Sequence, residues 1–94
     1  MKSIVSFIHI GIVYAVNLAF IRYFLAVAET GGFTAAAERC HVTQPTLSAG
    51  IARLEEEIGN RLFDRARRAA LTPAGQRLLP HAHIMVDAWQ AAQR

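Results

Sequence analysis

The stretch that decides the fold of this 94-residue chain is residues 33–59, which read FTAAAERCHVTQPTLSAGIARLEEEIG. It holds two apolar patterns of helical spacing, joined by a short connection at residues 40–42. The first pattern consists of Phe33, Ala36, Ala37 and Cys40. These positions follow i, i+3, i+4 and i+7, so they share one helical face, and the small alanines let another helix approach closely. The pattern predicts a short helix from residue 33 to residue 40.

The second pattern predicts a longer helix over residues 44–58. Its apolar stripe consists of Leu47, Ile51, Leu54 and Ile58. Thr43 is a suitable N-cap, and Pro45 fits a first turn, where a missing N–H costs nothing. Gly59 can end the helix in a left-handed conformation. Two helices with a three-residue turn and facing apolar sides predict a helix-turn-helix.

A helix of this kind can enter the DNA major groove and read bases with its N-terminal residues. Here those residues are Gln44, Thr46 and Ser48. A glutamine amide matches adenine in two hydrogen bonds, and hydroxyl groups adapt to several bases. Arg53 lies on the outward side, where phosphate binding and pairing with a neighbouring glutamate are equally open alternatives. We expect the three glutamates at 55–57 to repel phosphate and to point away from the DNA backbone.

Helical spacing also precedes this stretch. Residues 18–28 carry apolar side chains on one face, after a capping Asn17 and before a Gly31-Gly32 stop. The next segment, residues 60–71, lacks a helical period and predicts a short β-hairpin wing. Within it, residues 61–68 hold four arginines against Asp64 alone. The arginines are Arg61, Arg65, Arg67 and Arg68. We expect the last three to touch phosphates or enter a minor groove.

The last segment, residues 73–94, predicts a long helix that starts at a Thr72-Pro73 cap. A coiled-coil spacing relates Leu78, Ala82, Met85 and Trp89, which predicts a dimer interface. Pro80 interrupts this pattern and predicts a kink. The expected domains are therefore an N-terminal extension (1–16), a winged helix-turn-helix (17–72) and the start of a linker and dimerisation helix (73–94).

Residues 1–16 form an apolar extension that does not match the rest of the chain. A signal peptide or membrane anchor is one interpretation, but the segment is too short to span a bilayer alone and lacks a cleavage site. A tail without a role in the fold is another. Because the domain pattern begins abruptly at Asn17, a third hypothesis is that translation begins at Val16 through a GTG codon.

The composition is mildly basic, and the motifs present favour a binding module over an enzyme or a metal protein. The hydrophobic fraction is 53%, the net charge is +3 and the pI is about 9.8. We find no paired carboxylates, nucleophile with a base, phosphate-cradling loop or metal-ligand spacing in the sequence, and we expect no cofactor. The single cysteine, Cys40, fits a reducing cytoplasm, and its place on the apolar face predicts a buried, inert thiol. We expect His41 to be a hydrogen-bonding turn residue.

Five motifs together resemble the LysR-type transcriptional regulators. They are FTAAAER (33–39), VTQPTLS (42–48), IARLEEEIG (51–59), RLFDR (61–65) and LTPAG (71–75). The resemblance as a whole covers residues 17–94 in one order without gaps. The resemblance implies a winged helix-turn-helix joined by a long linker helix to a C-terminal effector-binding domain. It also implies cytoplasmic dimers or tetramers that bind promoter DNA and respond to a small-molecule co-inducer. Carried over position by position, it implies DNA contacts by Gln44, Pro45, Thr46, Ser48, Arg53, Arg65 and Arg68.

Two departures from the family pattern bear on function. Ala49-Gly50 replaces the longer polar or basic side chains of many members, which puts contacts there in doubt. The chain also stops at Arg94, inside the expected linker helix, so we expect no effector domain and no inducer site in it. The alternative function is therefore a truncated interaction module, which forms mixed dimers with a full-length regulator and does not bind DNA productively by itself.

Overall fold

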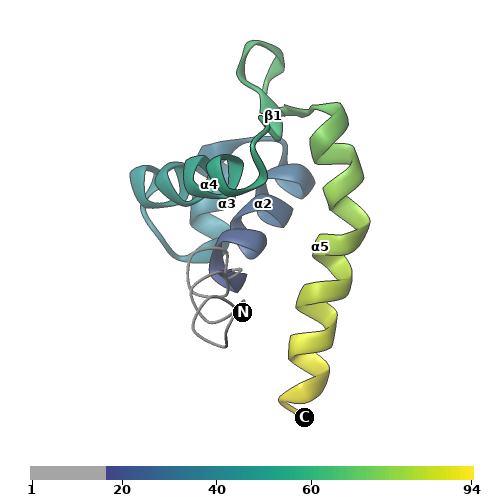
Figure 1. The fold of residues 1–94 in the computed structure, drawn as a ribbon. Helices are drawn as coiled ribbons and strands as arrows, with labels where there is room; N and C mark the ends of the chain where they lie inside the picture. Colours follow the sequence, from purple (N-terminus) through teal and green to yellow (C-terminus); the bar gives the residue numbers. More distant parts are fainter. Residues whose placement is uncertain (1–16) are drawn as a thin grey trace, which may run out of the picture.

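The computed structural model describes residues 17–94, which form four α-helices and a small two-stranded sheet (Figure 1). The helices are α2 (Leu18–Thr30), α3 (Phe33–Cys40), α4 (Gln44–Ile58) and α5 (Pro73–Ala92). The strands are β1 (Phe63–Asp64) and β2 (Ala70–Leu71), with a 3-10 turn, η1, at Arg65–Arg67 between them. This confirms the predicted, mainly α-helical winged helix-turn-helix with a long C-terminal helix. The hypotheses about the extension at 1–16 lie outside the described residues.

The predicted capping residues set the helix boundaries. Side-chain oxygens of Asn17, Thr43 and Thr72 accept backbone N–H bonds of 2.9, 3.3 and 3.1 Å in the first turns of α2, α4 and α5. Gly31 and Gly59 end α2 and α4 with φ angles of 79° and 80°, a left-handed conformation that glycine adopts without steric cost. The starts of α2, α4 and α5 and the ends of α2 and α4 thus follow from local chemistry.

The core lies where α2, α3 and α4 meet the root of the wing. Its largest fully buried side chains are Phe24, Phe63, Ile21, Leu47, Ile51, Leu62 and Val27. The stripe of α4 reaches the core only as far as Leu54, because Ile58 is 38% exposed at the helix end. The prediction that Ile58 belongs to the buried stripe is therefore wrong. The remaining stripe still fixes which side of α4 is free.

Gly50 provides close contact between α4 and α2. A Cβ atom at Gly50 would lie 2.7 Å from Cδ2 of Tyr23 and 2.9 Å from Cδ1 of Phe20, closer than real Cβ contacts. The residue is buried on the inner side of α4. The sequence puts contacts with DNA in doubt at this position, and the packing gives a physical reason, because Gly50 faces the aromatic side chains of α2.

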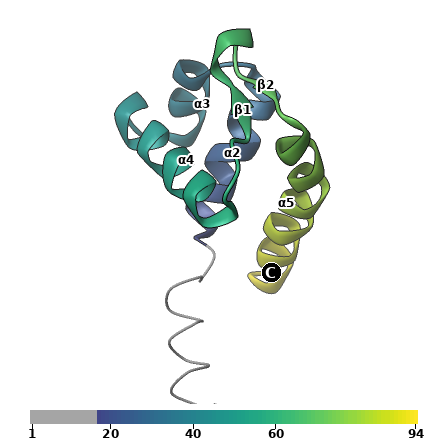
Figure 2. The ribbon, with the colours of Figure 1, turned by 45° about the horizontal axis from the view of Figure 1, so that its top comes forward.

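The wing is a minimal antiparallel hairpin in which Phe63 pairs with Leu71 and Asp64 with Ala70. It projects beyond the three-helix core, and α5 descends from its second strand along α2 (Figures 1 and 2). Thr72 closes the hairpin root, because its N–H donates to the carbonyl oxygen of Leu62 at 3.0 Å.

The stripe predicted as a dimer seam on α5 packs mainly against the chain's own core. Ala82 is fully buried there, and Leu78 and Met85 are partly buried against the same cluster. Of the four predicted seam residues, only Trp89 is largely free, with 46% exposure, and it is joined by Ile84 at 63%. The buried part of this stripe covers α2 and cannot also contact a partner. A dimer interface on α5 remains a prediction, and of the predicted stripe only Trp89 is exposed enough to contribute to it.

Candidate nucleic-acid interface

The N-terminal tip of α4 presents the side chains that were predicted to read bases. Gln44, Pro45 and Thr46 are exposed, and Ser48 is half-buried. The first turn of a helix also leaves backbone N–H groups without helical partners and carries the positive end of the helix dipole. The tip therefore combines donors, acceptors and a favourable field for an anionic ligand.

Two hydrogen bonds order the side chains of this tip. Nε2 of Gln44 donates to Oγ of Ser48 at 2.9 Å, one helical turn further on. Oγ1 of Thr43 donates to Oγ1 of Thr46 at 2.9 Å and also caps the helix. A glutamine amide has two N–H donors and an acceptor oxygen, so the bond to Ser48 leaves one donor and the oxygen free. The remaining groups are those that a bidentate contact with adenine requires.

Arg53 lies on the exposed side of α4 and forms no ion pair with any residue in 17–94. Intrahelical pairing with Glu56 or Glu57 was one of the two alternatives for this side chain, and the structure does not contain it. The guanidinium group is therefore free to meet a phosphate group. Small neighbours such as Ala49 and Ala52, both exposed, leave space around it.

The wing supplies a second group of cations. Arg65, Arg67 and Arg68 are all exposed, and the last two form no ion pair within the described part of the chain. Arg68 and Ala69 both adopt positive φ angles, 52° and 59°, which is uncommon for residues other than glycine. Such backbone strain persists where the surrounding structure requires it and is enriched at functional sites.

Arg65 differs from the other wing arginines because it has partners within the protein. Its Nη2 atom lies 3.3 Å from Oε1 of Glu55, and its guanidinium carbon lies 4.7 Å from the ring centre of Phe33. Glu55 is 8% exposed, so unlike Glu56 it lies on the buried side of α4 and points into the protein. The sequence spacing indicates this burial, since position 55 follows Ile51 by four residues and therefore lies on the buried side of the helix.

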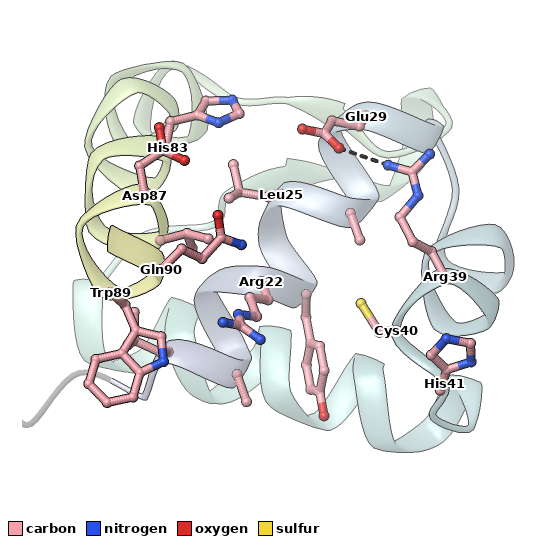
Figure 3. A pocket seen from close by; sticks show the side chains of 15 residues that line it. Arg22, Leu25, Glu29, Arg39, Cys40, His41, His83, Asp87, Trp89 and Gln90 are labelled. Atoms are coloured by element: carbon pink, nitrogen blue, oxygen red, sulfur yellow. Dashed lines mark hydrogen bonds and ion pairs between the residues drawn. The ribbon is translucent and has the colours of Figure 1, made fainter. Parts of the chain in front are cut away.

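A groove of about 790 Å³ lies between α2, the end of α3 and the second half of α5 (Figure 3). Figure 3 shows Arg39, Cys40 and His41 on one side of it and His83, Asp87 and Trp89 on the other. This groove was not predicted, and it brings together none of the predicted DNA-binding residues. Within residues 17–94, no group of three or more potential metal ligands occurs.

Cys40 is half-buried at this groove, so it is less buried than predicted. Burial raises the pKa of the Cys40 thiol above its ordinary value, although the nearby positive charges of Arg39 and Arg22 act in the opposite direction. The thiol is therefore less reactive than a free cysteine. His41 ends α3 in a left-handed conformation, with a φ of 57°, and its N–H donates to the carbonyl oxygen of Glu38. This confirms its predicted role in the turn.

A helix-turn-helix followed by a two-stranded wing defines this chain as a winged helix-turn-helix protein. It belongs to the LysR family of bacterial regulatory helix-turn-helix proteins, whose family model matches residues 18–76. One relative, an HTH-type transcriptional regulator from the ibpB-leuC intergenic region of Azotobacter vinelandii, is 47% identical over 79 residues, covering 83% of this chain and 55% of the relative.

Solved structures of the family include complexes with DNA. Vibrio fischeri DarR in complex with DNA matches with a TM-score of 0.79 and 35% identity, over 82% of this chain and 27% of that one. The BenM DNA-binding domain on the catB site 1 DNA matches with a TM-score of 0.77 and 36% identity, over 82% of this chain and 88% of that one. The chain thus spans about half of the A. vinelandii relative and about a quarter of DarR. Across residues 17–94, we find no helix with the length and hydropathy needed to cross a membrane.

Proposed function

We propose that this chain binds double-stranded promoter DNA in a sequence-dependent way and thereby regulates transcription in the cytoplasm. The observation that carries the proposal is the exposed, hydrogen-bonded tip of α4 in a domain that also presents an arginine-rich wing. α4 enters the major groove, where Gln44, Thr46 and Ser48 meet base edges and Pro45 packs beside them. DarR and the BenM domain, two similar proteins, have been solved on DNA, which supports this use of the fold. The proposal gives the chain no catalytic role.

The arginines supply affinity that does not depend on sequence. Within residues 17–94, Arg53 on α4 and Arg67 and Arg68 on the wing form no ion pair, and they release counterions when they meet phosphates. Arg65 contributes its outer N–H groups, since its side chain is 45% exposed despite the pair with Glu55. Phosphate contacts of this kind position a protein on the duplex, while base contacts specify the site.

Titration of the purified 94-residue chain against labelled duplexes tests this proposal. A duplex is first selected from a randomised library and is then compared with a scrambled duplex by fluorescence anisotropy. We expect tighter binding to the selected duplex, and a plot of log K against log salt with a slope of about −3.6 or steeper, from four or more phosphate contacts. Equal affinity for both duplexes, or a flat salt dependence, would contradict the proposal.

We also infer that α5 pairs with α5 of a second chain. The large apolar side chains of Ile84 and Trp89 are exposed on this helix, and a small domain gains stability when a partner covers such surface. Sedimentation equilibrium should show a dimer that Ile84→Glu dissociates, and a monomeric wild-type chain would contradict the inference. DNA binding by the chain alone separates a self-sufficient dimer from a module that acts only with a full-length regulator.

A further inference from the structure

We propose that Glu55 is a positioning residue of the DNA interface, which fixes the wing relative to the recognition helix α4. The carboxylate of Glu55 makes two contacts outside its own helix. Its Oε2 atom accepts the N–H of Leu62 at 2.8 Å, and its Oε1 atom accepts a bond from Nη2 of Arg65 at 3.3 Å. Leu62 directly precedes the first strand of the wing, and Arg65 begins the turn at its tip.

The contact with Leu62 fixes the root of the wing. Leu62 is fully buried, so its N–H would lack a partner if Glu55 were absent. The carbonyl oxygen of the same residue accepts the N–H of Thr72 at 3.0 Å, at the start of α5. The peptide unit of Leu62 is therefore held by α4 on one side and by the residue that caps α5 on the other.

The contact with Arg65 fixes the outer part of the wing. The guanidinium group lies between the Glu55 carboxylate and the ring of Phe33, at the start of α3. Phe33 in turn meets Phe63 of β1 edge to face, with ring centres 5.8 Å apart. A planar, always charged group suits this position, because it can bond to a carboxylate in its plane while it stacks on an aromatic face.

This arrangement matters for DNA binding because the two proposed contact regions, the tip of α4 and the wing, lie on separate elements. The wing projects away from the helical core (Figure 1), while Gln44 is the first residue of α4 and the wing follows the last residue of that helix, Ile58. Both regions can meet one duplex at full strength only when their relative position is fixed beforehand, since ordering a mobile loop on binding lowers affinity. Glu55 connects them from a buried position on α4, through its bonds to Leu62 and Arg65.

The test compares Glu55→Gln with Glu56→Gln in the full 94-residue chain. Both variants remove one negative charge from adjacent positions of α4, but Glu56 is exposed and has no ion-pair partner within residues 17–94. A glutamine at position 55 keeps an oxygen for Leu62 but no longer attracts Arg65. Glu55→Ala removes both contacts.

The first measurement uses the chain without DNA, by ¹⁵N relaxation and amide exchange. We expect backbone order at 65–69 to fall in Glu55→Gln and to stay unchanged in Glu56→Gln. We expect the amide of Leu62 to exchange at least about tenfold faster in Glu55→Ala. Equal wing order in both glutamine variants would overturn the proposal.

The second measurement uses the duplex selected by the wild-type chain. Simple electrostatics predicts that loss of either negative charge strengthens binding. The positioning role predicts the opposite sign for Glu55→Gln, with about tenfold weaker binding, while Glu56→Gln binds as tightly as wild type or more tightly. Equal affinities of the two variants would overturn the proposal. This second measurement, of DNA affinity, rests on the proposed function. If wild type binds no duplex, the proposed function fails, and the measurement without DNA still decides whether Glu55 positions the wing.

Discussion

Gln44 and Ser48 are joined across one turn of α4 by a hydrogen bond of 2.9 Å from Nε2 to Oγ. The bond holds the Gln44 amide in one orientation at the exposed tip of the helix. Because one N–H and the oxygen of this amide stay free, the bond can orient the side chain without blocking its contact with a base. Order established before binding reduces the entropy that a specific contact costs.

Replacement of Gln44 with Ala should relax sequence preference. A bidentate contact discriminates by about 1–3 kcal/mol, so one base pair of the selected site should lose most of its information. Ser48→Ala should have a smaller effect at the same base pair, because it removes only the partner that orients Gln44. Selection of duplexes from a randomised library with each variant measures this. Unchanged preferences in Gln44→Ala would contradict the assignment of this residue to base reading.

The wing arginines should act on all sequences alike. Arg67→Ala and Arg68→Ala should each weaken binding to selected and scrambled duplexes by a similar factor. The salt slope should become less steep by about 1 for each lost phosphate contact. Arg94→Ala is the matched control, because it removes the same charge at the far end of the chain (Figure 1). If the Arg94 variant changes the slope as much as the others do, the wing is not the phosphate contact.

Gly75 should be intolerant of any side chain. A Cβ atom there would collide with the backbone carbonyl oxygen of Leu62 and would lie 2.8 Å from Cδ2 of Leu71. A backbone atom cannot move aside as a side chain can, so Gly75→Ala should lower the free energy of unfolding by about 2–3 kcal/mol. Urea denaturation measures this. The neighbouring exposed position provides the control, since Gln76→Ala should change stability by less than about 0.5 kcal/mol.

Cys40 should react slowly with iodoacetamide. Its pKa is raised by burial, and the thiolate is the reactive form, so at any pH below that pKa the folded chain holds less thiolate than the unfolded chain. The pH midpoint of alkylation should therefore lie higher in the folded chain than in the same chain in urea. A midpoint below that of the unfolded chain would instead indicate an activated thiol and would contradict the account of this residue.

Features that depend on neighbouring residues in the chain could be predicted from the sequence. Thr43 caps α4 because its hydroxyl reaches a backbone N–H within the same turn, and Gly59 ends the helix because it accepts a left-handed conformation. The predicted DNA-contacting tip also follows from this local logic, since Leu47 and Ile51 fix the inner side of the helix and leave Gln44 at its exposed start.

Features that depend on contacts between distant segments could not be predicted in the same way. The spacing of Ala82 on α5 is compatible with a partner helix or with the chain's own α2, and only the three-dimensional packing shows that it faces the core. In the sequence, Gly50 indicates only the lack of a side chain that could contact DNA. The structure shows that the ring of Tyr23 packs against this position. Glu55 looks like one of three similar glutamates, although its partners lie seven and ten residues away.

The central claim is that the tip of α4 and the wing form one DNA-binding surface. NMR titration of the ¹⁵N-labelled chain with its selected duplex tests this claim most directly. The account predicts that the largest amide shift changes occur at residues 44–48 and 65–69, and that the amides of Ile84 and Trp89 on α5 change little. Largest changes on α5 or along the groove beside Cys40, with the tip of α4 unaffected, would contradict it.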